Sequence, residues 1–246
     1  REIADLVVRT DGRGAKAVRI LSNDENGVYA LSQEISDPEF RFFVGDVRDK
    51  ERMLLASNGA DIVFHAAALK HVPLCEYNPM EAVKTNVIGT QNAIAACMEN
   101  EVDKMIFVST DKAVEPVNTM GASKLLAEKL VLDANLYKGN RRTAYSVVRF
   151  GNVLGSRGSV IPLWMEQAAG GGPITLTGEG MTRFIMSVGE AVELMFKATA
   201  LAKGGETFIF KMPVVRMLDL AEVIRDEVSA KAGRDPGKVR ILHCDA

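Results

Sequence analysis

The chain has 246 residues, 47% hydrophobic and 25% charged, which fits an ordinary soluble protein of one large α/β domain or one domain with a small appendage. Its 30 basic and 32 acidic residues give a net charge of −2, which gives no indication of a nucleic-acid or anionic-membrane surface. No apolar run approaches the roughly 18 residues of a membrane span and no signal peptide is visible, so we expect no membrane partner and a cytoplasmic location.

Apolar runs of strand length alternate with longer segments of helical periodicity. In chain order, the expected elements are a helix over 1–10, strands over 17–21, 42–44 and 62–65, a helix over 80–99, a strand over 105–108, a helix over 119–137, a strand over 144–149 and a helix over 188–202. This alternation predicts an α/β fold with a doubly wound parallel sheet and crossover helices.

Polar and small residues gather where the predicted strands end. Ligands of open α/β sheets bind outside the carboxyl ends of the strands. The segments at those ends are Ser22-Asn23-Asp24, Gly45-Asp46-Val47, Ala66-Ala67-Ala68, Ser109-Thr110-Asp111-Lys112 and Gly151-Asn152. We therefore expect the functional site along this edge.

Two further features shape the expected domain organisation. Glycine, proline and serine cluster after residue 150, in "GNVLGSRGSVIP" and "GGGPITLTGEG". We expect a nucleotide-binding domain over 1–150 and a smaller lobe over 151–246, interleaved with it. The first strand and glycine-rich loop of a dinucleotide fold are absent from the expected elements, because "REIADLVVRT" reads as the first helix and "DGRG" follows it.

Cysteine and histidine show no ligand pattern. The three cysteines are odd in number and scattered, and the histidines stand alone, so we expect reduced thiols and no metal site. These residues are Cys75, Cys97, Cys244, His65, His71 and His243.

Three stretches carry a family resemblance: "FVSTDKAVEPVNTMGASKLLAEKL", "FHAAALKHVPLCEYNPMEAVKTNVIGT" and "VRFGNVLGSRGSVIP" with the later "MTRF". Together they resemble the extended short-chain dehydrogenase/reductase superfamily, and within it the soluble UDP-N-acetylglucosamine 4,6-dehydratases of polysaccharide biosynthesis. The resemblance runs from about residue 1 to about residue 240 and implies a Rossmann-like fold. The chain departs from the family in lacking the first strand and glycine loop, in Met120 at the tyrosine of YxxxK, and in its tail "KVRILHCDA".

The resemblance implies a lyase that oxidises C4 of the sugar, eliminates water across C5 and C6, and returns the hydride to C6. Asp111 is then the acid at C6 and must be protonated when it acts, while Lys112 is the base at C5 and must be neutral. Thr110 would hydrogen-bond the C4 oxygen and Lys124 would hold the nicotinamide ribose. Met120 cannot accept a proton, so deprotonation of the C4 hydroxyl falls on Asp111 directly or through Thr110.

The remaining site residues also follow from the resemblance. A tightly bound NAD or NADP is expected, with a weak preference for NAD because Asn23 stands where an arginine would suit a 2′-phosphate. Cofactor contacts are expected from Ser22, Asn23, Asp24, Asp46, Val47, Ala66, Ala67, Ala68, Asn86 and Lys124. Contacts with a UDP-sugar substrate are expected from Lys70, His71, Asn152, Arg157, Ser159, Val160 and Arg183. Family members form oligomers, so we expect a homo-oligomer.

Each assignment has a simpler alternative. The pair Asp111-Lys112 can be a solvated turn, Lys124 an ordinary helix lysine beside Glu128, and Met120 a filler of an apolar gap. His71 next to proline can be structural, and Arg157 and Arg183 can be surface charges. At the level of function, the alternatives are a UDP-sugar C4 epimerase, which needs no acid–base pair for elimination, and a catalytically idle NAD(P)-binding module.

Overall fold

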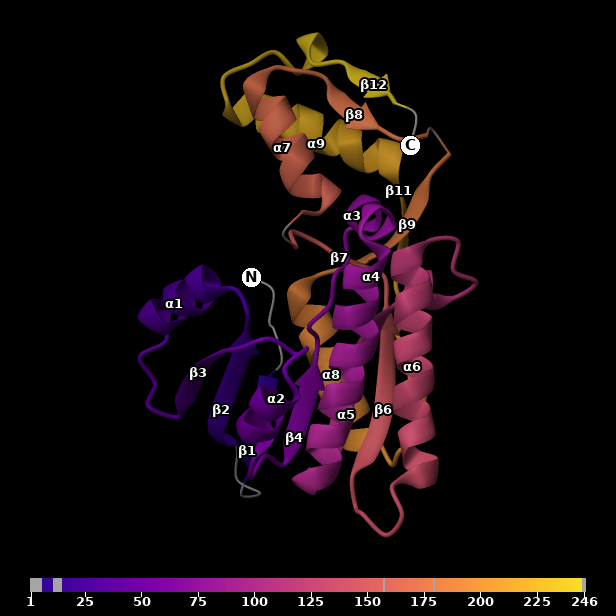
Figure 1. Cartoon of the computed structure of the whole chain (residues 1–246). Coiled ribbons are helices and arrows are strands. Elements are labelled where there is room, and N and C mark those ends of the chain that lie inside the picture. The colour runs from indigo at the N-terminus through magenta and orange to yellow at the C-terminus, as the bar shows by residue number, and fades with distance from the viewer. Residues whose placement is uncertain (1–5, 11–14, 157, 179, 245–246) are drawn as a thin grey trace. The chain divides into compact units, whose positions relative to one another are not determined.

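The computed structural model describes residues 6–10, 15–156, 158–178 and 180–244 of the chain. The chain divides into two compact units, one of residues 1–149 and 194–210 and the other of residues 150–193 and 211–246 (Figure 1). Among the described residues, no helix combines the length and the apolar character needed to cross a membrane.

A seven-stranded sheet forms the centre of the first unit, in the order β10-β6-β5-β4-β1-β2-β3. Its strands are β1 Leu6–Thr10, β2 Ala15–Ser22, β3 Phe40–Val44, β4 Ile62–His65, β5 Lys104–Thr110, β6 Ala144–Phe150 and β10 Thr207–Ile209. The pairs β2–β3, β4–β5 and β6–β10 are parallel. The predicted α/β fold with a parallel sheet is confirmed.

The prediction of a helix over 1–10 is wrong for residues 6–10, which form β1; residues 1–5 lie outside the described residues. β1 runs antiparallel to both of its neighbours, β2 and β4. Its sequence "LVVRT" contains two β-branched valines, and the place between two strands supplies backbone hydrogen bonds on both sides. A helix of five residues has little stability of its own, so pairing with β2 and β4 decides the conformation of this segment.

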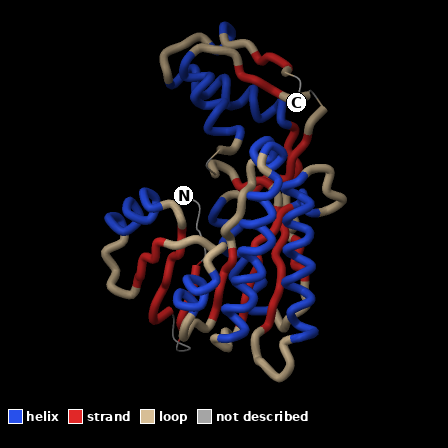
Figure 2. Tube along the Cα trace, viewed as in Figure 1, coloured by secondary structure: helices blue, strands red, loops and turns tan. Residues whose placement is uncertain are grey.

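Helices lie against the sheet of the first unit and at the ends of its strands (Figure 1 and Figure 2). They are α1 Glu25–Glu34, α2 Lys50–Ser57, α3 Val72–Tyr77, α4 Pro79–Ala82, a π-helical turn η1 Val83–Ile88, α5 Gly89–Glu99, a 3-10 turn η2 Asp111–Ala113, α6 Thr119–Tyr137 and α8 Val188–Leu201. The helix predicted over 119–137 is confirmed as α6. The segment predicted as one helix over 80–99 is α4, η1 and α5 in succession, because a π turn interrupts it.

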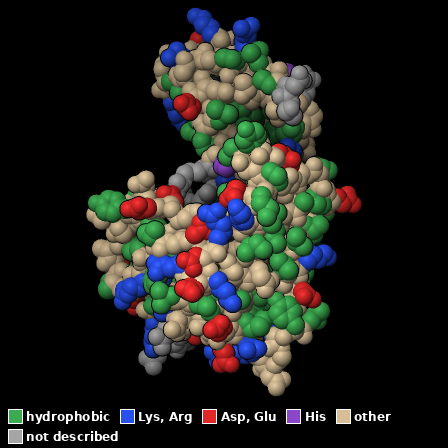
Figure 3. Space-filling view, in the orientation of Figure 1, with side chains coloured by type: hydrophobic (Ala, Val, Ile, Leu, Met, Phe, Trp, Pro, Cys, Tyr) green, Lys and Arg blue, Asp and Glu red, His purple; other side chains and the backbone are tan. Residues whose placement is uncertain are grey.

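The core of this unit lies between the sheet and the inner faces of α2, α5 and α6. Its fully buried members include Val63, Ile94, Met105, Phe107 and Val147. On the visible face of the first unit, Lys and Arg side chains are interspersed with Asp and Glu (Figure 3), in keeping with the small net charge. Because β4 and β5 pair in parallel, their polar carboxyl ends lie at the same edge of the sheet.

The second unit has its own core and two small sheets, ordered β11-β9-β7 and β12-β8. Its elements are β7 Asn152–Val153, α7 Val160–Gly170, β8 Ile174–Leu176, β9 Thr182–Met186, β11 Val214–Arg216, α9 Met217–Lys231, a 3-10 turn η3 Pro236–Lys238 and β12 Ile241–His243. Trp164 is buried in this core and its indole N–H donates to the Thr175 carbonyl over 2.6 Å. The indole therefore ties α7 to β8.

Candidate active site

Thr110, Asp111 and Lys112 meet at the carboxyl end of β5. The Thr110 hydroxyl donates to Asp111 Oδ1 over 2.9 Å, and Lys112 Nζ donates to the same oxygen over 3.1 Å. The Asp111 side chain is 25% exposed and that of Lys112 is 34% exposed, so both can meet a ligand. A hydroxyl, a carboxylate and an amine within hydrogen-bond distance can pass a proton among them.

The start of α6 packs closely against this cluster. Asn118 caps the helix by accepting a hydrogen bond from the Gly121 amide over 2.8 Å. A β-carbon at Gly121 would lie 2.3 Å from the Lys112 carbonyl oxygen. Glycine at this position is therefore what lets the Asp111–Ala113 turn rest on the helix.

Lys124 is buried in α6, with 5% of its surface exposed. Its ammonium donates to the Val108 carbonyl over 2.7 Å and lies 3.9 Å from the centre of the Phe107 ring. Glu128, the partner expected of an ordinary helix lysine, is instead bound by Arg149 over 2.8 Å. The structure thus places the Lys124 charge beside β5, two residues before Thr110.

Met120 is 4% exposed and packs with Cys75 and Ala82, against Val72. These residues come from α3 and α4, so the thioether fills an apolar space between those helices and α6. Burial raises the pKa of the Cys75 thiol, which keeps it neutral. The packing of Met120 agrees with its alternative as a filler of an apolar gap.

Asn86 joins the segment after β4 to α6. Its amide nitrogen donates to the Leu69 carbonyl over 3.0 Å and to Ser123 Oγ over 2.9 Å, and its amide oxygen accepts from the Leu69 N–H over 2.7 Å. Asn86 is 1% exposed, so these bonds form without competition from water. The residue holds two parts of the expected site in register.

Of the residues predicted for the adenosine, Asn23 and Asp46 lie together at the ends of β2 and β3. The Asp46 carboxylate accepts from Arg48 over 2.7 Å, and this hydrogen bond holds the pKa of Asp46 below its usual range, with a further contribution from Asn23. Arg48 also binds Glu81 over 2.9 Å. Asp46 is therefore a fixed anion at this edge.

Ser22, Asp24 and Val47 serve the local structure around that anion. Asp24 caps α1 by accepting from the Gly27 amide over 2.9 Å, and its own N–H donates to Ser22 Oγ over 3.1 Å. Val47 is buried, and a β-carbon at Gly89 would come within 2.6 Å of its methyl group. These contacts fix the backbone that follows β2 and β3.

The donor set at these strand ends fits two parts of a dinucleotide. Small half-buried residues, Ala66 to Ala68, follow β4, and Lys124 supplies a buried cation. Ser109 Oγ, at the end of β5, is buried and has no hydrogen-bond partner among the described residues, which leaves it for a ligand atom. No glycine-rich turn leads from β1 to a helix within the described residues, so they supply no cradle for a pyrophosphate.

Lys70 and His71 follow the Leu69 segment that Asn86 holds. His71 stands at the start of α3, and its side chain makes no capping hydrogen bond to that helix. Both residues therefore directly follow the Leu69 backbone that Asn86 binds, in the segment between β4 and α3.

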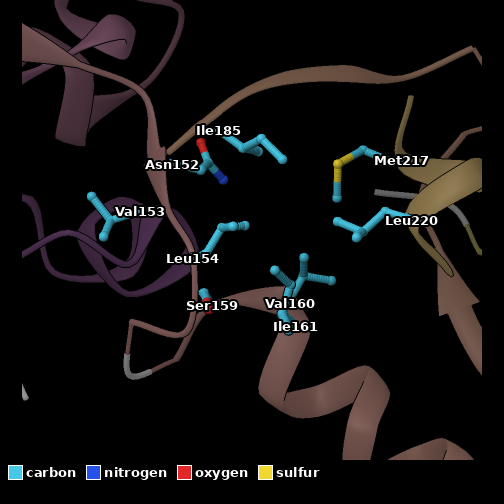
Figure 4. A pocket seen from close by; sticks show the side chains of 9 residues that line it. All are labelled: Asn152, Val153, Leu154, Ser159, Val160, Ile161, Ile185, Met217 and Leu220. Carbon is cyan, nitrogen blue, oxygen red and sulfur yellow. The ribbon is translucent and has the colours of Figure 1, made fainter. Parts of the chain in front are cut away.

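Of the residues predicted to bind substrate, Asn152, Ser159 and Val160 line one pocket in the second unit (Figure 4). The rest of its lining is apolar and consists of Val153, Leu154, Ile161, Ile185, Met217 and Leu220. Ser159 Oγ is buried without a hydrogen-bond partner among the described residues. Arg183, on β9, donates to the Thr182 carbonyl over 2.9 Å. Arg157 lies outside the described residues.

Several residues that shape the site receive no individual role from the sequence patterns. Gly121, Ser123 and Ser109 stand inside the motifs quoted for the family, but their roles depend on contacts with other segments. Arg48 follows Asp46 by two residues, and this spacing was the available signal for their pairing. A residue's position inside a motif does not show what it contacts.

Apart from the antiparallel β1, the order of the sheet, its crossover helices and the polar carboxyl ends of its strands agree with the Rossmann-like fold expected from the sequence. The profile of the family described as "Polysaccharide biosynthesis protein" matches residues 3–241. The chain belongs to this family. The expected resemblance is thereby confirmed.

Similar proteins include enzymes of nucleotide sugars. A UDP-N-acetylglucosamine 4,6-dehydratase (inverting) of Campylobacter jejuni is 46% identical over 213 residues, which cover 86% of this chain and 64% of that protein. A UDP-glucose 4-epimerase of Rickettsia canadensis is 43% identical over 216 residues, covering 88% of this chain and 63% of that protein. The chain thus spans just under two thirds of the length of these two relatives.

Two further matches complete the comparison. An uncharacterised membrane protein of Methanocaldococcus jannaschii is 61% identical over 226 residues, covering 92% of this chain and 68% of that protein. The X-ray structure of Pen from Bacillus thuringiensis superposes with a TM-score of 0.90 at 44% identity, covering 94% of this chain and 71% of that one.

Proposed function

We propose that the chain is a nucleotide-sugar 4,6-dehydratase that acts on UDP-N-acetylglucosamine, with NAD or NADP as a tightly bound cofactor, in polysaccharide biosynthesis. The convergence of Thr110 and Lys112 on one oxygen of Asp111 carries the proposal, because elimination needs an acid and a base side by side. The 46% identical dehydratase of Campylobacter jejuni supports the choice of substrate.

A nicotinamide cofactor would take a hydride from C4 and return it to C6. For the cofactor, Asn23 and Asp46 are suited to the adenosine end, while Lys124 and the segment Ala66 to Ala68 are suited to the nicotinamide end. NAD-bound structures of similar fold, such as DesIV of Streptomyces venezuelae with a TM-score of 0.84, support a nicotinamide dinucleotide. Asn23 in place of an arginine favours NAD over NADP.

The chain's own residues move three protons. Thr110 accepts the proton of the C4 hydroxyl while its own proton passes to Asp111 Oδ1, along the 2.9 Å hydrogen bond. Lys112, which this step requires to be neutral, then takes the C5 proton, and Asp111 gives its proton to the C6 hydroxyl, which leaves as water. Lys112 finally returns its proton to C5 when the hydride returns to C6, so every proton is accounted for within one turnover.

Each unit offers residues that suit part of the substrate. Lys70 and His71 suit the sugar or its diphosphate, and Asn152, Ser159, Val160, Arg157 and Arg183 suit the nucleotide sugar, Arg183 through its planar fork of donors. We assign residues 1–150 to the cofactor, apart from the substrate contacts Lys70 and His71, and residues 151–246 to the substrate. Exposed apolar residues on α6, including Leu126 and Leu136, favour a homo-oligomer.

A UDP-sugar C4 epimerase is the second candidate, because the Rickettsia epimerases reach 43% identity. Epimerisation uses the same oxidation at C4 but breaks no C–O bond at C6. The paired Asp111 and Lys112 therefore favour the dehydratase. An idle NAD(P)-binding module would retain no such pair.

The substitution Asp111→Asn tests the proposal. We expect wild-type protein to convert UDP-N-acetylglucosamine into a product lighter by one water, and the variant to lose at least about 100-fold in kcat. Asp103→Asn is the control, because Asp103 is an exposed partner of Arg142 at the other end of β5, and it should keep full activity. A variant Asp111→Asn with wild-type kcat would contradict the proposed acid.

A further inference from the structure

Two buried residues outside the proposed reaction, His65 and Thr90, are linked to each other and to Asn86. Both are 0% exposed, His65 at the end of β4 and Thr90 in α5. The Thr90 hydroxyl donates to the Asn86 carbonyl over 2.7 Å, and His65 Nε2 lies 3.0 Å from Thr90 Oγ1. Because the single hydroxyl proton is directed to Asn86, Thr90 Oγ1 accepts a hydrogen bond from Nε2–H of His65.

The residue they reach stands in the π-helical turn η1, Val83–Ile88. Such a turn is rare, and it persists where surrounding contacts support it. The Thr90 hydroxyl holds the backbone of Asn86, while the Asn86 amide holds Leu69 and Ser123. A turn that relaxed to α-helix would rotate this amide away from both partners.

Ring packing also connects His65 to α6, at Lys124. The His65 ring lies 5.6 Å from the ring of Phe107, and the Lys124 ammonium lies 3.9 Å from that same ring. Lys124 directly follows Ser123, the residue that Asn86 binds. Hydrogen bonds and ring packing thus both lead from His65 to Lys124.

We propose that His65 and Thr90 are positioning residues for the reaction. They fix the π-helical turn and, through Asn86, hold Lys124 and the backbone around Leu69 in working register. The inference rests on the proposed dehydratase function. Neither side chain touches the substrate, so their contribution is to the placement of groups that do.

The test is Thr90→Val, which keeps the size and branching of the side chain and removes the hydroxyl. Thr199→Val is a matched control, because Thr199 is 6% exposed and its hydroxyl donates to the Met195 carbonyl over 2.7 Å, the same helical geometry in α8. We expect Thr90→Val to lose more melting temperature than Thr199→Val, because it also leaves Nε2–H of His65 without an acceptor. Only Thr90→Val should lose about tenfold or more in kcat, with KM for the UDP-sugar within about threefold of wild type.

Conservative variants provide the rescue. Thr90→Ser keeps the hydroxyl and should return kcat to within about threefold of wild type. His65→Gln, whose amide nitrogen can donate as Nε2 does, should retain more activity than His65→Leu. Equal kcat values for Thr90→Val and Thr199→Val, or a serine variant as slow as the valine variant, would overturn the proposal.

The failure of the function and the failure of this inference are separable. If wild-type protein does not convert the sugar, the proposed function fails and the variants cannot be compared by kcat. Crystal structures of wild type and Thr90→Val then decide. Loss of the π-helical turn and of the bond from Asn86 to Ser123 in the variant supports positioning, and their retention refutes it.

Discussion

Replacement of Gly121 by alanine tests whether the close approach of α6 to the turn at Asp111 and Lys112 is needed for activity. The added β-carbon would lie 2.3 Å from the Lys112 carbonyl oxygen, about 1 Å less than the 3.4 Å at which ordinary van der Waals contact begins. A backbone oxygen cannot rotate away, so the turn that carries both proton-transfer groups has to move by about that distance. A displacement of about 1 Å in a catalytic group can lower a rate by about 100-fold.

We therefore expect Gly121→Ala to lower kcat by about 100-fold in a coupled or mass-spectrometric assay of the UDP-sugar. Overpacking should destabilise the fold by about 1–3 kcal/mol, offset in part by the better helix propensity of alanine, so the melting temperature should change by only a few degrees. The control is Gly189→Ala in the first turn of α8, where the nearest atom is Ser187 Oγ at 4.0 Å. It should keep full kcat, and wild-type kcat in Gly121→Ala would refute the reasoning.

Two further predictions concern stability. Glu128→Ala removes one partner of a buried ion pair with Arg149 and should lower the stability by about 3 kcal/mol in urea denaturation, whereas Glu227→Ala at the exposed pair with Lys231 should change it by less than about 1 kcal/mol; equal effects would contradict the importance of burial. Arg48 holds the pKa of Asp46 below its unfolded value, so this ionised pair stabilises the fold above about pH 4 and the contribution is lost as pH falls through the folded pKa. The melting-temperature difference between wild type and Arg48→Met should therefore shrink from about pH 6 to about pH 3, and a constant difference would contradict the pairing.

The parts of the fold that depend on local pattern could be predicted from the sequence. α6 has a capping asparagine at 118, and β5 is a buried apolar run that ends in polar residues, so both follow from neighbouring residues. β1 could not be predicted, because its five residues become a strand through pairing with β2 and β4. The π-helical turn at Val83–Ile88 likewise depends on contacts that Asn86 makes 17 and 37 residues away.

The candidate site divides in the same way. The residue types at the end of β5 could be predicted, because their motif is contiguous. The partners of Lys124 and Glu128 could not, since a helix spacing of four residues predicts a pair between them and the buried environment supplies Val108 and Arg149 instead. Burial and segments distant in the sequence decide the partners of these two charged residues.

The most direct test of the dehydratase proposal is mass spectrometry of UDP-N-acetylglucosamine after incubation with the protein and NAD in heavy water. We expect a product that has lost one water and carries solvent deuterium at C5, because in heavy water the Lys112 amine is deuterated before it protonates C5. A product of unchanged mass and without deuterium that separates from the substrate by chromatography would identify an epimerase. Unaltered substrate would contradict catalysis of either kind by this chain.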